Sequence, residues 1–197
     1  MNIKRYIATI ILAIVLLLNF SCTDWLDVKP VDRMSEDQLY STEAGFRQAL
    51  NGIYVELNHA DLYGDELLVN TVEILAQRYK FSSMGTLTNQ YHLAEFDYTT
   101  DYAKKCGSRI WEKAYALIAN VNKLLKNADS HKDLFTGDSY DLITGEAYAL
   151  RAFLHFDLLR LFGPVYKTHK EDKSICYNTQ FSLSGSDLLP ASKVMEY

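Results

Sequence analysis

The chain has 197 residues, of which 48% are hydrophobic and 13% aromatic, and its formal net charge is −5. These proportions exclude intrinsic disorder, which requires fewer apolar residues and a higher net charge. A nucleic-acid-binding protein is disfavoured, because no part of the chain carries the excess of basic residues that contact with phosphates requires. The length is that of one domain.

The first 21 residues have the pattern of a secretion signal. Lys4 and Arg5 form a short basic segment, and an apolar run follows from Ile7 to Leu18, broken only by Thr9. As a helix, this run would cover about 18 Å, well short of the roughly 30 Å of hydrocarbon in a bilayer. The pattern therefore predicts a signal peptide rather than a permanent transmembrane helix.

A cysteine follows the signal directly. The sequence Asn19-Phe20-Ser21-Cys22 resembles a bacterial lipobox, in which the signal is cut before the cysteine and a lipid is attached to its sulfur. Stable anchoring takes more than one acyl chain, so a multiply acylated Cys22 would tether the domain without a transmembrane helix. The alternative is an ordinary cleaved signal that a cysteine happens to follow.

The other two cysteines, Cys106 and Cys176, lie 70 residues apart. They could pair in an oxidising compartment, but nothing in the sequence brings their Cα atoms close enough for a disulfide. Two free thiols are therefore favoured. The chain has no Cys-x-x-Cys motif and no cluster of cysteines and histidines, so we predict neither a metal site nor a cofactor.

We expect three parts: a signal peptide over 1–21, a lipid-anchored tether over 22–34 and a helical domain over 35–197. The pattern from Ser35 to Gln38 has the form of a capping box and should begin a short helical turn. Beyond it, apolar residues recur at spacings of three and four, which predicts amphipathic helices.

Three such helices are expected: one that begins after Ser41, one over 65–79 and one over 108–126. The residues expected on their buried faces are Phe46, Ala49, Leu50, Ile53 and Leu57 in the first, Leu68, Val72, Leu75 and Tyr79 in the second, and Trp111, Tyr115, Ile118, either Val121 or Asn122, and Leu125 in the third.

Residues 81–101 lack periodicity and are expected to form a long connection. Loops of this length inside a domain are uncommon and are often functional. Sugar recognition uses flat apolar rings, with amides and hydroxyls that fix orientation. Tyr91 and Tyr98 are therefore the candidate ligand-binding residues, with Asn89, Gln90 and Asp97 nearby. The alternative is that the two rings only pack the loop onto the helices.

A fourth helix is predicted over 139–162, because the Gly-Pro pair that follows cannot continue it. At 100° per residue, Glu146, Asp157 and Arg160 fall within about 60° of one another. We expect these three to form an ion-pair network with a neighbouring helix. An acid–base site is disfavoured, since no sequence feature raises the pKa of either carboxyl group.

Arg151 and His155 lie on the opposite side of this fourth helix, and two broad apolar faces separate the two polar strips. A surface helix needs only one apolar face, so we expect this one to be sandwiched between neighbours, as in stacked helical hairpins. His155 is expected to serve packing or hydrogen bonding rather than catalysis.

Four segments share their order and spacing with a known family. They are Cys22-Thr23-Asp24-Trp25-Leu26-Asp27, the run from Gly45 to Tyr54, Arg109-Ile110-Trp111 followed by Tyr115, Ile118 and Asn120, and Glu146-Ala147 followed by Arg151-Ala152, His155-Phe156-Asp157-Leu158 and Leu161-Phe162-Gly163-Pro164-Val165-Tyr166. Together they resemble the N-terminal part of the SusD/RagB family. The resemblance implies an all-α fold of tetratricopeptide-like stacked helical hairpins. That fold is expected to be incomplete here, because the chain would stop within the family's next helix.

The resemblance also implies a function. Members of the family are lipoproteins exposed at the outer-membrane surface of Bacteroidota, which bind oligosaccharides or other nutrients and partner a SusC-like TonB-dependent transporter. The same role is expected here, without catalysis. The alternative is a tetratricopeptide-like scaffold lipoprotein that binds another protein. A glycosidase is disfavoured, because no carboxylate pair stands out in the sequence.

Overall fold

The structure, a computed structural model, describes residues 34–81, 85, 87–182 and 186–197. The predicted signal peptide, Cys22 and nearly all of the predicted tether lie outside the described residues. The helices and strands that the structure describes belong to one compact unit, Glu36–Tyr197. Among the described residues, no helix has both the length and the apolar character needed to cross a membrane.

This unit is mostly helical, which confirms the predicted all-α class. Three long helices dominate it: α3 (Glu43–Leu57), α6 (Asp101–Ser130) and α7 (Ser139–Phe162). The shorter elements are α2 (Glu36–Leu39), α4 (Thr71–Leu75), α5 (Thr88–Ala94), the 3₁₀-helix η2 (Lys132–Leu134), α8 (Tyr166–His169), β1 (Lys173–Cys176), β2 (Leu188–Pro190) and α9 (Ala191–Glu196).

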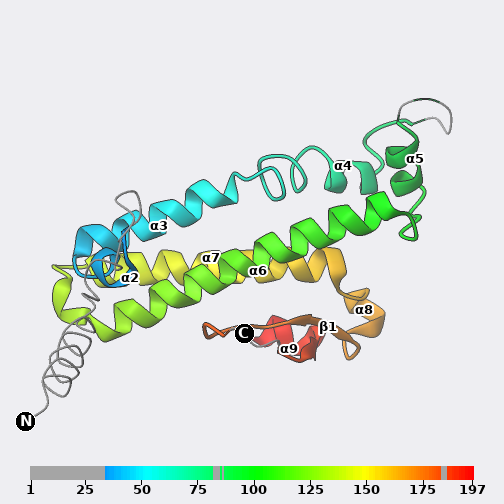
Figure 1. Ribbon diagram of the computed structural model, residues 1–197. Coiled ribbons are helices and arrows are strands. Elements are labelled where there is room, and N and C mark those ends of the chain that lie inside the picture. Colours follow the sequence, from blue (N-terminus) through cyan, green and yellow to red (C-terminus); the bar gives the residue numbers. More distant parts are fainter. Residues whose placement is uncertain (1–33, 82–84, 86, 183–185) are drawn as a thin grey trace, which may run out of the picture. The chain divides into compact units, whose positions relative to one another are not determined.

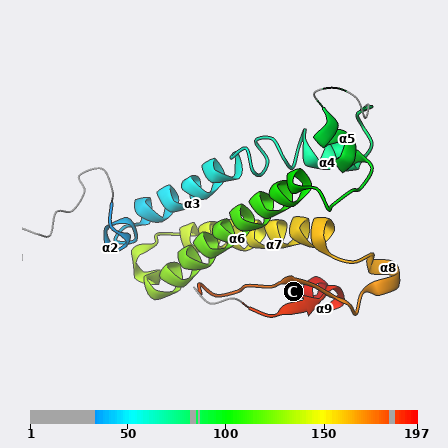
Figure 2. The ribbon, with the colours of Figure 1, turned by 45° about the vertical axis from the view of Figure 1, so that its right-hand side comes forward.

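The long helices are arranged as a helical hairpin with a third helix beside it. Figure 1 shows α6 and α7 running antiparallel, with α3 alongside. Their facing sides form one core, whose fully buried members include Phe46, Leu117, Ile118, Leu154 and Leu158. Figure 2 shows β1 and α9 following α7 on the side away from α3. Strands β1 and β2 pair antiparallel, with Ile175 opposite Leu189.

Two of the predicted helices match the structure closely. Helix α7 begins and ends where it was predicted, because Gly163 and Pro164 end it. In α3, the predicted face is correct, with Phe46, Leu50 and Ile53 buried. Helix α6 is longer than predicted, because its first turn is capped by a side chain: the Thr100 hydroxyl accepts from the Ala103 N–H at 3.3 Å.

The helix predicted over 65–79 is wrong. Only Thr71–Leu75 is helical, and hydrogen-bonded turns occupy the residues before it. The expected buried face is half correct: Val72 and Leu75 are partly buried against the core, but Leu68 and Tyr79 are 56% and 45% exposed, and Ile74 is buried instead. The reason is the buried Glu66 carboxylate, which pairs with Arg109 of helix α6. This contact holds the residues before α4 in turns, although their apolar spacing favours a helix.

Helix α7 is covered on only part of its surface. Its contacts are with α3 and α6 on one side and with β1 and α9 on another. The second predicted apolar face remains open in the described part of the chain, where Tyr148 and Phe156 are 49% and 47% exposed. The expected sandwich is therefore only half correct.

The predicted ion-pair network on α7 is replaced by tyrosine hydroxyls. Arg160 pairs with Asp157 at 2.9 Å, but both belong to α7. The contacts to other segments come from Tyr54, which donates to Glu146 at 3.0 Å, and from Tyr63, which donates to Asp157 at 2.7 Å. Neutral donors therefore join α3 and the turn after it to α7.

His155 has the structural role predicted for it. Its ring is 1% exposed, and its Nδ1 lies 2.8 Å from the Arg151 carbonyl oxygen in the same helix. Its Nε2 accepts from the Asn178 backbone N–H at 3.1 Å. These two partners require a neutral ring with the proton on Nδ1, and burial lowers the pKa of His155 to about 4. The ring thus holds the segment after β1 against α7.

A glycine permits the close contact of α2 with α3. A Cβ at Gly45 would lie 1.7 Å from the Leu39 carbonyl oxygen. We expect Gly45→Ala to lower the free energy of unfolding by about 2 kcal/mol, because backbone would have to move. The matched control is Gly52→Ala in the same helix, where a Cβ meets nothing within 4 Å. This control should raise stability by up to about 1 kcal/mol, and urea denaturation of both variants checks the contrast.

Candidate functional site

The segment 81–101, predicted to be a loop, contains a helix. Helix α5 ends at Ala94, and Phe96 follows in a left-handed conformation with φ of 59°. The Asp97 N–H donates to the His92 carbonyl at 2.9 Å and the Phe96 N–H to that of Leu93 at 3.0 Å. This is a Schellman motif, in which glycine usually takes the left-handed position. Because a phenylalanine occupies this position, the sequence contains no glycine that would indicate the end of the helix.

Helix α4 ends in the same way. Gln77 has φ of 58°, and the Arg78 N–H donates to the Glu73 carbonyl at 3.0 Å. The Gln77 side chain donates to the Ala94 carbonyl at 2.6 Å and so joins the ends of α4 and α5. The two short helices share a small core with α6, formed by Ile74, Leu93, Ala94 and Ala103.

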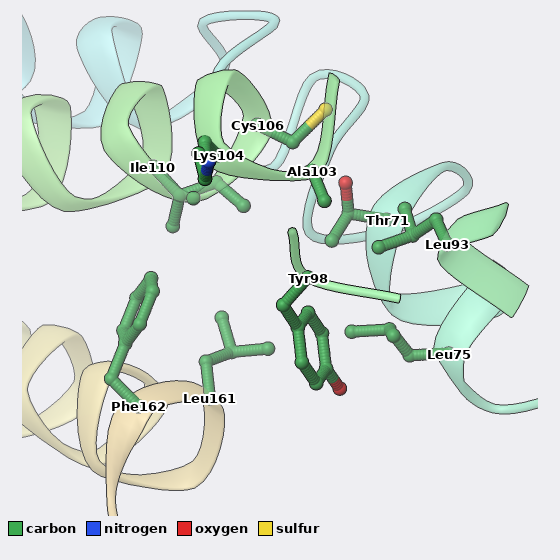
Figure 3. Close-up of a pocket in the computed structure, with 11 residues that line it drawn as sticks. Thr71, Leu75, Leu93, Tyr98, Ala103, Lys104, Cys106, Ile110, Leu161 and Phe162 are labelled. Atoms are coloured by element: carbon green, nitrogen blue, oxygen red, sulfur yellow. The ribbon is translucent and has the colours of Figure 1, made fainter. Parts of the chain in front are cut away.

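A pocket of about 410 Å³ lies where these short helices meet α6 and the end of α7. This volume is within the range of sites for small molecules. Its walls are mainly apolar and come from α4, α5, α6, α7 and the turn before α6. Figure 3 shows these side chains converging on the pocket. The apolar lining residues are Leu75, Leu93, Ala103, Ile110, Leu161 and Phe162.

Polar groups are few, and two of them are available to a ligand. Tyr98 lines the pocket and is 58% exposed. Lys104 lines it from the first turns of α6. Neither the Tyr98 hydroxyl nor the Lys104 ammonium forms a hydrogen bond with a side chain or backbone group that the structure describes. The pocket thus offers an aromatic ring, a hydroxyl and a cation beside an apolar surface.

The other two polar residues of the pocket, Thr71 and Cys106, contact a cluster of charged side chains around the buried Glu66 carboxylate. The Thr71 hydroxyl donates to Glu66, whose side chain is 3% exposed. Arg109 forms a hydrogen-bonded ion pair with the same carboxylate and lies 3.6 Å from an Asp61 oxygen. The Arg109 guanidinium also reaches the Cys106 sulfur at 3.8 Å. This cluster supports the pocket from within.

Of the two tyrosines predicted to bind ligand, Tyr98 lines the pocket and Tyr91 does not. Tyr91 lies on α5, half-buried, with its ring edge-on to His92 at 5.7 Å. Asp97 is occupied locally, since it accepts from the Thr99 N–H at 3.0 Å and from the Thr99 hydroxyl at 2.6 Å. These hydrogen bonds lower the pKa of Asp97.

Sequence reasoning missed Lys104 and Phe162 as lining residues. Both belong to helices that the sequence predicts. That they line the same pocket as Tyr98, however, depends on how α6 and α7 pack against each other. Cys106 and Cys176 are both free thiols, the first buried and the second partly buried. Among the residues that the structure describes, no three histidine, cysteine or acidic side chains are grouped as metal ligands would be.

Comparison with known proteins decides the family. Residues 24–184 match the model of a SusD-like family that is described as "Starch-binding associating with outer membrane". The chain belongs to this SusD-like family. The match covers all three long helices, the pocket and β1, and it confirms the resemblance inferred from the four sequence segments.

Two SusD-like relatives come from Formosa agariphila. SusD-like protein P2 is 27% identical over 162 residues, which are 82% of this chain and 30% of the relative. SusD-like protein P25 is 27% identical over 148 residues, or 73% of this chain and 28% of the relative. The chain therefore spans less than a third of the length of these relatives.

Proposed function

We propose that this SusD-like protein binds glycans at the outer membrane and does not transform them. The observation that carries the proposal is the Tyr98 pocket, where an exposed ring and unpaired polar groups border an apolar wall. Pyranose rings present C–H groups on their faces and hydroxyls at their edges, so they match such a surface. The family description, which names starch, supports the same ligand class.

The anchor and the partner complete the proposal. Cys22 would carry the lipid that holds the protein on the membrane, since acyl chains supply the anchoring energy that a single short helix lacks. A SusC-like TonB-dependent transporter would receive the ligand. Copurification with such a transporter from membranes of the native organism would support this step, and a Cys22→Ala variant that remains bound to membranes would contradict the anchor.

Tyr98→Ala tests the binding site. We expect its affinity for the bound glycan to fall about tenfold, because a stacking surface and a hydroxyl are lost together. Isothermal titration calorimetry with maltooligosaccharides, followed by a panel of other glycans, measures the effect. Tyr148→Ala is the matched control, since Tyr148 is an exposed tyrosine on α7 that does not line the pocket.

Tyr91 remains a second candidate contact, outside the pocket. Tyr91→Ala should weaken binding less than Tyr98→Ala if the ligand extends over α5. If Tyr98→Ala binds every glycan as tightly as the unaltered protein does, the pocket is not the site. If the unaltered protein retains no glycan and captures only other proteins, the scaffold function is correct instead.

A further inference from the structure

The interior of the Tyr98 pocket differs from its rim. Five of the lining residues are buried, and we call them the floor: Thr71, Leu93, Ala103, Cys106 and Ile110. Figure 3 shows Leu161 and Phe162 of α7 on the opposite side of the pocket from Ile110. Tyr98 and Lys104 are exposed and stand at the rim. The floor and the rim therefore suit different parts of a ligand.

The polar side chains of the floor are already engaged. Thr71 donates its hydroxyl to the Glu66 carboxylate, and the Cys106 sulfur lies 3.8 Å from the Arg109 guanidinium. The rest of the floor is apolar. A hydroxyl group that is buried against such a surface without a hydrogen-bond partner is unfavourable. The part of a ligand that enters the floor must therefore be apolar, unlike the hydroxyl-bearing ring of a sugar.

A glycine in α6 keeps the pocket open. Gly107 lines the pocket from the interior of this helix, where glycine is less stable than alanine. The packing does not require a glycine, because a Cβ at this position would make only an ordinary contact, 3.6 Å from a ring carbon of Phe162. A longer side chain would fill space between α6 and Phe162. The glycine therefore maintains the cavity rather than the fold.

The charged residue of the lining is Lys104. Its ammonium forms no ion pair with the carboxylates of the described part of the chain. Lys104 also lines an adjoining hollow of about 350 Å³, so it stands at the edge of the pocket, in reach of water. An anion paired there keeps part of its hydration while its apolar part is buried. The lining thus complements a ligand with an apolar body and one anionic end.

We propose that the Tyr98 pocket binds a medium-chain fatty acid, with its alkyl chain against the floor and its carboxylate at Lys104. Aliphatic and small side chains predominate in the lining, which favours an alkyl chain. The volume of about 410 Å³ is near the lower end for small-molecule sites, which favours one chain over a lipid with several. The proposal goes beyond the proposed function and does not depend on it, because a glycan on the exposed Tyr98 ring need not enter the floor.

A series of fatty acids of increasing length tests the alkyl site. From hexanoate to decanoate, below their micellar concentrations, each added methylene group should tighten binding about fourfold in isothermal titration calorimetry. Gly107→Leu should weaken decanoate binding at least about tenfold, because the leucine side chain takes the space of the alkyl chain. Gly145→Leu is the matched control, since Gly145 lies on α7 outside the pocket and a Cβ there meets nothing within 4 Å.

A second pair of variants tests the carboxylate contact. Lys104→Met should weaken decanoate binding about threefold and leave the affinity for decanol, which has no charge, unchanged. Lys105→Met is the control, because Lys105 is exposed on the same turn of α6 and does not line the pocket. Lys104 is exposed too, so this pair keeps the test valid even if Gly107→Leu fails to fold.

The outcomes are distinct. Affinity that does not rise with chain length, or decanoate binding that persists unchanged in Gly107→Leu, overturns the proposal. Equal affinity of Lys104→Met and the unaltered protein for decanoate overturns the placement of the carboxylate. Fatty-acid binding without glycan binding overturns the proposed function alone, and glycan binding without fatty-acid binding overturns this proposal alone.

Discussion

Arg109→Met is expected to lower the free energy of unfolding by about 3 kcal/mol, because it leaves the Glu66 carboxylate buried without its cation. The Glu66 side chain is 3% exposed, and Arg109 supplies its ion pair. The Thr71 hydroxyl alone would then face the charge. Urea denaturation at neutral pH measures the loss.

A second variant on α6 provides the control. Lys113 pairs with Glu56, whose side chain is 48% exposed, so Lys113→Met should cost less than about 1 kcal/mol. Adding Glu66→Gln to Arg109→Met should recover at least half of the loss, since the buried charge is removed while an acceptor for Thr71 remains. Arg109→Met could prove as stable as Lys113→Met, or the double variant could recover nothing. Either result would show that the charge of the buried Glu66 carboxylate does not need Arg109 for neutralisation.

Acidification from pH 7 to pH 4 is expected to cost the fold about 3 kcal/mol through His155 alone. Burial lowers the pKa of His155 from 6.5 to about 4. The unfolded chain therefore binds the proton more readily than the folded chain between these two values. The contribution of His155 to the free energy of unfolding is therefore complete above about pH 6.5. It falls as the pH drops towards 4 and changes little at lower pH.

Chemical denaturation at a series of pH values measures this effect. His155→Gln should be less stable than the unaltered protein at neutral pH, and its stability should depend less on pH between 6.5 and 4. His169→Gln, at an exposed site in α8, should keep the original dependence. An unchanged pH dependence in His155→Gln would show that other groups control the acid response.

The sequence predicts those parts of the fold that are decided by local signals. Helix α7 was placed correctly because Gly163-Pro164 can only end a helix, and the buried face of α3 followed from its spacing. The helix over 65–79 failed because Glu66 pairs with Arg109, which is 43 residues away. No local pattern contains that contact.

The site was only partly predictable, for a similar reason. Aromatic composition directed attention to Tyr98, which lines the pocket, but the lining residues Lys104 and Phe162 come from two different long helices. Helix α5 was missed because Phe96 occupies a position where glycine would normally signal the end of a helix. The course of the segment around Asn178 was not predictable either, because it depends on hydrogen bonds from the buried His155 and Asn122, which belong to two different helices.

Two tyrosines join α7 to α3 and to the turn that follows α3, and their chemistry affects how the fold responds to ionic strength. Dissolved ions weaken attraction between exposed opposite charges, but the hydroxyls of Tyr54 and Tyr63 are uncharged donors. The hydrogen bonds of these two tyrosines should therefore persist at both low and high ionic strength, whereas surface ion pairs such as Lys113 with Glu56 should weaken as salt is added.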